Sequence, residues 1–261
     1  MTKTPKSMGL SRRNVLKGAA AGGLLIGTSG IAAAGNKAGE ATYEVTIENL
    51  TSDTPTESPP AAGQWFTPPV IATHRPSTGM FTVGEPASFE VKEIAENGNL
   101  GPMQDALVAD KHVGEFVVAA VDDNMLPPPL APGNYVSVDI SGDRGRKYLS
   151  FVSMLICTND GFTGVDTIRL PKKVGDTVTM ETDGYDAGTE MNTEDFADMV
   201  PPCPGLSGVE TDDMGTGTSD PTIAEDEVIR KHPGIRGGVD LAPLVHGWED
   251  PVGRITIERI D

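Results

Sequence analysis

The chain has 261 residues, a formal net charge of −18, 31 Gly, 21 Pro and only 5% aromatic residues. The high Gly and Pro content disfavours a helical bundle and favours a turn-rich β protein, while the 38% of hydrophobic residues argues against a fully disordered chain. The negative charge argues against a nucleic-acid partner. The two Cys cannot build a disulfide-rich scaffold or a zinc site of four thiolates.

Residues 1–34 have the features of an export signal. They contain five bases and no acid, and the pair Arg12-Arg13 precedes a weakly apolar stretch rich in Ala and Gly. The run Ala32-Ala33-Ala34 fits a small-residue cleavage site. We predict a twin-arginine signal peptide over residues 1–34 and a secreted, extracellular protein. A retained N-terminal anchor is the alternative. Beyond residue 34 no apolar run approaches 18 residues, so no membrane span is predicted in the mature chain.

Cleavage after residue 34 would make the protein still more acidic. It removes five bases and no acid, which takes the net charge from −18 to −23. An acidic surface with few Lys is tolerated in concentrated salt, because the Debye length is roughly 3 Å at about 1 M salt. We therefore predict a halophilic protein, with an ordinary acidic secreted protein as the alternative.

After a short linker (residues 35–42), the remaining chain has the pattern of a single β domain over residues 43–261. Residues 148–157 are apolar on both alternating faces, which predicts a central strand. A long acidic segment rich in Gly and Pro, 196–240, is predicted to be irregular surface. Other strands are predicted at 43–47, 136–140, 164–170, 177–181 and 255–259, short apolar pieces at 70–72 and 116–121, and helices at 88–97 and 101–111.

Acidic residues follow two of these predicted strands. Asp160 comes directly after the central strand, and Asp183, Asp186 and Glu190 lie together in a Gly-containing segment after a later strand. In a sandwich, loops that leave neighbouring strands converge at one end, so these carboxylates could meet. Ca²⁺ prefers 6–8 oxygen ligands of this kind, and a cation would relieve their mutual repulsion. The acids at 212–213 and 225–227 are interpreted as solvated surface.

Catalytic signatures are scarce. There is no HExxH, GxSxG or Walker A motif. The four His, which are His74, His112, His232 and His246, lie far apart in the sequence and are interpreted as structural or surface residues. Cys157 lies in the apolar central strand and Cys203 in a Pro-rich segment. They could pair outside the cell, or remain one buried thiol and one loop thiol.

Several segments resemble one family. Residues 149–166, LSFVSMLICTNDGFTGVD, resemble the central segment of spondin N-terminal domains, and residues 185–190, YDAGTE, resemble that family's Asp-Ala-Gly-Thr-acid turn. Residues 74–81 and 84–88 resemble the amino-terminal part of its prokaryotic members, and residues 254–257 its closing strand. The resemblance covers roughly residues 43 to 260.

This resemblance implies a mainly β fold, a C2-like antiparallel β-sandwich, here with a short helical insertion and a long acidic loop. The animal members, F-spondin and mindin, are secreted matrix or adhesion proteins whose spondin domain binds a divalent cation, usually calcium. By position, Asp160, Asp186 and Glu190 would be the metal ligands, with Asp166 and Asp183 as second-tier candidates. Animal members usually have Asp where this chain has Glu190, and an aromatic residue where it has Gly161.

We therefore expect a secreted, non-enzymatic calcium-binding module that acts in cell-surface binding or adhesion. Its partner would be an unknown extracellular protein or cell-surface ligand. One alternative is an extracytoplasmic hydrolase that uses the same carboxylates for acid–base chemistry, although the few aromatic residues offer little stacking surface for a sugar. The other alternative is a metal-free structural envelope protein.

Overall fold

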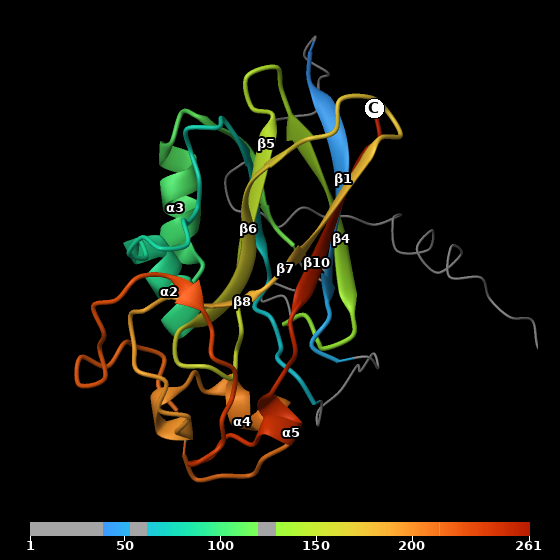
Figure 1. Ribbon diagram of the computed structural model, residues 1–261. Helices are drawn as coiled ribbons and strands as arrows, with labels where there is room; N and C mark the ends of the chain where they lie inside the picture. The colour runs from blue at the N-terminus through green and yellow to red at the C-terminus, as the bar shows by residue number, and fades with distance from the viewer. Residues whose placement is uncertain (1–38, 53–61, 120–128, 214) are drawn as a thin grey trace, which may run out of the picture.

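The computed structural model describes residues 39–52, 62–119, 129–213 and 215–261, called the described residues below. They form two antiparallel sheets with a helical layer on one side (Figure 1). This confirms the predicted mainly β sandwich. The predicted signal peptide, 1–34, lies outside the described residues, as does the first half of the predicted linker, 35–38.

The first sheet has four strands in the order β4-β1-β10-β7. Alternating residues of β1 and β10 are buried, and Val45 lies opposite Ile257 in the register of the pair. This is the period-two pattern that the sequence shows for a sheet with one face in the core. The strands are β1 (Ala41–Asn49), β4 (Tyr135–Gly142), β7 (Thr177–Thr182) and β10 (Gly253–Arg259).

The second sheet has six strands in the order β3-β2-β5-β6-β8-β9. They are β2 (Val70–His74), β3 (Val113–Val118), β5 (Tyr148–Met154), β6 (Gly161–Arg169), β8 (Gly184–Asp186) and β9 (Arg230–Lys231). β5 pairs with β2 and β6, and every residue of β5 after Tyr148 is buried. The prediction of a central strand is therefore confirmed, although the strand ends at Met154 rather than at Cys157.

The six-stranded sheet is covered on both faces, which explains why β5 is apolar on both sides. One core, which includes Phe151 and Ile255, lies between the two sheets. A second core, which includes Val152 and Ile94, lies between the six-stranded sheet and the helices. The helical layer contains α2 (Phe89–Asn97) and α3 (Gly101–Ala109), close to their predicted positions.

The acidic segment 196–240 is largely irregular, as predicted, but it contributes to the second core. It contains the short helices η1 (Phe196–Asp198) and α4 (Pro202–Leu206) as well as β9, and α5 (Pro243–His246) follows it. Phe196, Met199 and Cys203 are buried against the six-stranded sheet. Within the described residues, no helix has the length and apolar character needed to cross a bilayer.

Candidate metal centre

The turn between β5 and β6 places Asp160 in the interior. Thr158 Oγ1 donates to the carbonyl of Leu155 and accepts from the amide of Gly161, which closes the turn. A Cβ at Gly161 would collide with Thr158 Oγ1, so a larger residue would displace the side chain that closes the turn. The closed turn leaves Asp160 fully buried.

Asp160 fastens this turn to the loop that follows β8. Its Oδ2 accepts hydrogen bonds from the backbone amides of Thr189, at 2.8 Å, and Glu190, at 3.1 Å. Its backbone carbonyl accepts from the amide of Ala187. In contrast, Asp160 Oδ1 is buried and has no hydrogen-bond partner among the described residues. A buried carboxylate oxygen without a donor is costly unless a proton or a cation reaches it.

Asp186 is the last residue of β8 and faces the same region. Its Oδ1 accepts from the amide of Gly188, whose φ of +71° suits a residue without a Cβ. Its Oδ2 accepts from Asn192 Nδ2 at 2.8 Å and lies 3.4 Å from Arg230 Nη2. Arg230 also pairs with Glu225, so its positive charge is shared rather than dedicated to Asp186.

Glu190 brings a third carboxylate to this region, and Glu96 of α2 brings a fourth. Glu190 is only 3% exposed, and its Oε1 accepts from the amide of Asp220. Glu96 is 4% exposed, and its Oε2 accepts from Ser219, the neighbour of Asp220. Glu96 Oε1 accepts no hydrogen bond from the described residues, although Lys92 Nζ lies 3.5 Å away.

Sequence reasoning missed Glu96. It lies four residues after Lys92, which is the spacing of an ordinary exposed ion pair on a helix. Only the packing of α2 on the sheet turns its carboxylate inward.

Burial and mutual repulsion raise the pKa of two of these carboxyl groups. Burial raises the pKa of Asp160 to about 7, and the neighbouring Asp186 carboxylate adds to the rise. Burial raises the pKa of Glu190 to about 8, with the Glu96 carboxylate as the next contribution. The four acids face Arg230, which Glu225 shares, and Lys92, which lies 3.5 Å from Glu96, so negative charge is in excess in this buried space. A bound cation would relieve this excess.

The three predicted ligands do not form a closed ligand shell. The described residues contain groups of three ligand atoms within 4.8 Å of one another, but Asp160, Asp186 and Glu190 are not such a group. Each of these carboxylates already accepts a hydrogen bond, Asp160, Asp186 and Glu190 from backbone amides and Glu96 from Ser219. The residues fit a hard cation in chemistry and charge, and a closed shell would require the longer Glu190 and Glu96 side chains to exchange these bonds for the ion.

Comparison with known protein families matches residues 41–200 to Spondin_N. This match spans more than half of the chain. The chain belongs to the Spondin_N family. The match includes Asp160, Asp186, Glu190 and Glu96, but it ends before Arg230 and the strand β10. A search of curated proteins found no match to the chain.

The two second-tier acids lie outside this cluster of the Spondin_N domain. Asp166 Oδ1 accepts from the amide of Met80 and from Ser150 Oγ, so it stabilises the segment before α2. Asp183 is about half exposed, and its Oδ2 lies 3.8 Å from Lys231 Nζ. Neither carboxylate is a cause of the raised pKa of Asp160 or Glu190.

Two other groups of potential ligands exist among the described residues. Cys157 and Cys203 approach His246, but their sulfur atoms form a disulfide, with a Cα–Cα distance of 5.0 Å. Of the two alternatives left open by the sequence, a disulfide or two free thiols, the structure has the disulfide. Asp195, Asp213 and Asp240 also bring carboxylate oxygens within 4.8 Å of one another, but Asp213 and Asp240 are exposed. This exposed trio provides a matched control for the buried cluster.

The raised pKa values of Asp160 and Glu190 predict an unusual pH dependence in chelator-treated protein. Unfolded carboxyl groups have pKa values of about 4, so between pH 6.5 and 8 the folded state binds more protons than the unfolded state. Stability should therefore fall as the pH rises through this range, by on the order of 1 kcal/mol. Urea unfolding at several pH values measures this slope.

Buried His residues do not reverse this expectation. Burial lowers the pKa of His232 to about 4 and also lowers the pKa of His246. Their contribution to stability is lost only as the pH falls below the pKa of about 6.5 of an unfolded His.

The control for the pH experiment is Asp160→Asn combined with Glu190→Gln, which should flatten the dependence of stability on pH above pH 6.5. A stability that rises with pH in the unsubstituted protein would contradict the prediction.

Proposed function

We propose that the protein is a secreted calcium-binding domain, non-enzymatic, that acts in binding or adhesion at the cell surface. The cation would join the β5–β6 turn to the loop after β8 and hold that end of the sandwich rigid. The observation that supports this most directly is the partnerless, fully buried Oδ1 of Asp160 among three further carboxylates. Membership of the Spondin_N family supports an extracellular location, and export by a twin-arginine signal is part of the same proposal.

Calcium suits this donor set better than magnesium does. Magnesium requires nearly ideal octahedral geometry and keeps several waters, whereas calcium accepts irregular shells of carboxylate and carbonyl oxygens. Asp160, Asp186 and Glu190 would supply the main ligands, with Glu96 as an additional carboxylate. The ion would place positive charge next to Asp160 Oδ1 and would remove the need for protons on Asp160 and Glu190.

A hydrolytic role is the second candidate, because a raised carboxyl pKa also suits a general acid. Asp160 and Asp186 are fully buried, however, and Glu190 nearly so, which favours an enclosed ion over a sugar chain as their partner. The described surface pockets of about 380 and 610 Å³ are lined by other residues.

Calcium titration of chelator-treated protein by calorimetry tests the proposal. We expect one calcium per chain, with a dissociation constant on the order of 10⁻⁴–10⁻³ M. Asp160→Asn should weaken binding at least tenfold, because the amide retains an oxygen that can accept from Thr189 and Glu190 but lacks the charge. Glu96→Gln should weaken binding by a smaller factor.

The control is Asp213→Asn, which removes a charge from the exposed trio and should leave calcium affinity unchanged. If Asp160→Asn and Asp213→Asn lose calcium affinity equally, the effect is one of nonspecific charge. If only Asp213→Asn loses affinity, calcium binds at the exposed trio instead. Either result, or a protein that binds no calcium, would contradict the proposal. Unchanged near-ultraviolet circular dichroism would verify that each variant is folded.

A further inference from the structure

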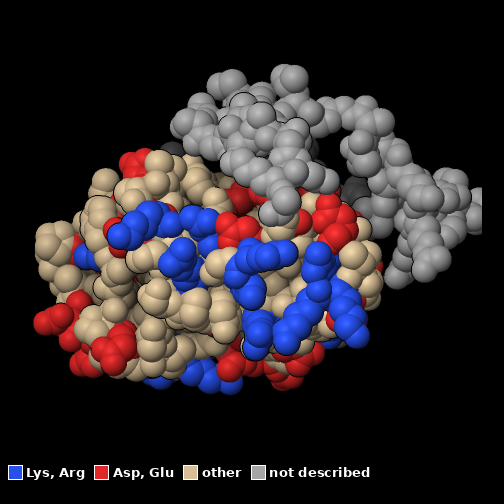
Figure 2. All heavy atoms as spheres, turned by 90° about the horizontal axis from the view of Figure 1, so that it is seen from above, with Lys and Arg blue, Asp and Glu red and all other residues tan. Residues whose placement is uncertain are grey.

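A pocket rich in basic side chains lies at the opposite end of the sandwich from the carboxylate cluster. Asp160 immediately precedes β6 and Arg169 ends it, so the two sites are separated by the length of this strand, roughly 26 Å. We define the basic pocket by its five cationic side chains, which are Arg144, Lys147, Arg169, Lys172 and Arg259. Figure 2, which looks onto this end from above, shows many Lys and Arg side chains on this face, with Asp and Glu side chains among and around them.

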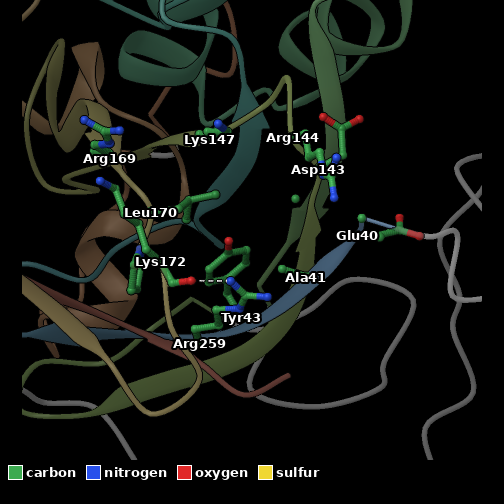
Figure 3. Close-up of a pocket in the computed structure, with 13 residues that line it drawn as sticks. Glu40, Ala41, Tyr43, Asp143, Arg144, Lys147, Arg169, Leu170, Lys172 and Arg259 are labelled. Atoms are coloured by element: carbon green, nitrogen blue, oxygen red, sulfur yellow. Dashed lines mark hydrogen bonds between the residues drawn. The ribbon is translucent and has the colours of Figure 1, made fainter.

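The five cations come from separate segments of the chain and surround one cavity (Figure 3). Arg144 and Lys147 lie in the connection between β4 and β5, Arg169 and Lys172 at the end of β6, and Arg259 at the end of β10. The sequence alone does not show that these basic segments meet, because they lie far apart in the chain. The pocket has a volume of about 380 Å³.

None of the five cations has an ion-pair partner within 4.0 Å among the described residues. The basic side chains that do form such pairs there are Lys92, His112, Arg146, Arg230, Lys231 and Arg254. Two acids, Glu40 and Asp143, also line the pocket, but Asp143 pairs with Arg146. In a chain with almost twice as many acids as bases, this pocket is an exception, because its five cations outnumber the acids of its lining.

The pocket is also partly preorganised. The Arg259 guanidinium donates to the backbone carbonyls of Lys172 and Asp261, which fixes its position, and Figure 3 shows the contact with Lys172. The buried side chains of Tyr43 and Leu170 form apolar parts of the lining. A Cβ at Gly142 would lie 3.0 Å from Leu170 and 3.2 Å from the Tyr43 ring, so a larger residue there would crowd this lining.

We propose that the basic pocket binds an anionic glycan, a sugar chain that carries sulfate or carboxylate groups. Arg side chains recognise such planar or tetrahedral oxyanions by charge-assisted hydrogen bonds. Five positive charges around a cavity of this size are more than one small anion would neutralise, and they suit a ligand with several separated negative charges. The apolar lining would contact the sugar ring between the charged groups.

A nucleic acid fits this pocket less well. Single-stranded nucleic acids use aromatic side chains as stacking platforms, whereas Tyr43, the aromatic residue of the lining, is only 6% exposed. A duplex would need an extended basic surface, and the net charge of −18 would repel its backbone beyond the pocket.

Binding of heparin, a sulfated glycan, and of polygalacturonate, a carboxylated glycan, tests the proposal by calorimetry at fixed ionic strength. We expect at least one of the two to bind, and neutral dextran not to bind. Arg169→Gln should weaken the binding about fivefold, and its combination with Arg144→Gln at least tenfold. Both Arg side chains are exposed and lack ion pairs among the described residues, so the variants should fold normally.

The matched control is Arg236→Gln, because Arg236 is an exposed Arg outside the pocket and outside the described ion pairs. It should leave glycan affinity within twofold of the original. Equal loss in Arg236→Gln and Arg169→Gln would overturn the proposal, as would equally tight binding of a single-stranded DNA of the same charge. The titrations are run with and without chelator, so failure of the calcium site and failure of this pocket give separate results.

Discussion

Calcium at about 10 mM is expected to raise the free energy of unfolding of the chelator-treated protein by about 1.4–2.7 kcal/mol. The range follows from mass action with a dissociation constant on the order of 10⁻⁴–10⁻³ M and no binding to the unfolded chain. The cation would relieve the repulsion that raises the pKa of Asp160 and Glu190, so the gain should be larger at pH 8 than at pH 6. Thermal unfolding, monitored by circular dichroism, measures this gain in stability.

Ionic strength must be held constant in this experiment, because a protein with a net charge of −18 is stabilised by salt through screening alone. Sodium chloride of the same ionic strength is the first control. Asp160→Asn is the second, and it should abolish the response to calcium while leaving the response to sodium. A shift of equal size in calcium and sodium would argue that the cation acts only by screening.

Loss of the disulfide between Cys157 and Cys203 is expected to destabilise the protein more than loss of calcium does. The two residues are 46 positions apart, and closing a loop of this length in the unfolded chain corresponds to on the order of 4 kcal/mol in the chain-entropy model. Replacement of both by Ala should lower the Tm by roughly 10 °C for a domain of this size. Both sites are buried, so Ala also avoids an unpaired buried thiol.

Reductant provides the control for this prediction. The unsubstituted protein should lose stability in reductant at neutral pH, and the double Ala variant should not respond. Cys157 begins the turn that carries Asp160, and Gln64 holds that turn by accepting from the Cys157 amide. The variant should therefore also bind calcium more weakly than the original. A Tm that is unchanged in the variant would show that packing alone holds α4 against the turn.

Strand positions could be predicted where the pattern of apolar and polar residues along the sequence matches the burial of the strand. β1, β4 and β10 alternate because one face of their sheet meets the core, and β5 is apolar throughout because both of its faces are covered. The predicted turn at 183–190 instead contains the short strand β8. Its three residues are fixed by pairing with β6 and β9 rather than by their own pattern.

The candidate site could be predicted only in part. Asp160, Asp186 and Glu190 were found from their motifs, and hydrogen bonds between their two loops connect the first to the third. Glu96 and the basic pocket were missed for a common reason. Both depend on which side chains the packing of distant segments brings together, and the local pattern of each segment is that of an ordinary solvated surface.

The position of β10 has a consequence for biosynthesis. This strand lies between β1 and β7, although residues 253–259 are made long after β1 (Ala41–Asn49). During translation β1 can pair with β4, but its other edge has no partner until these residues have left the ribosome. The nascent chain thus carries an open strand edge while the residues between β1 and β10 are made, so chaperone protection at that stage would guard it from aggregation.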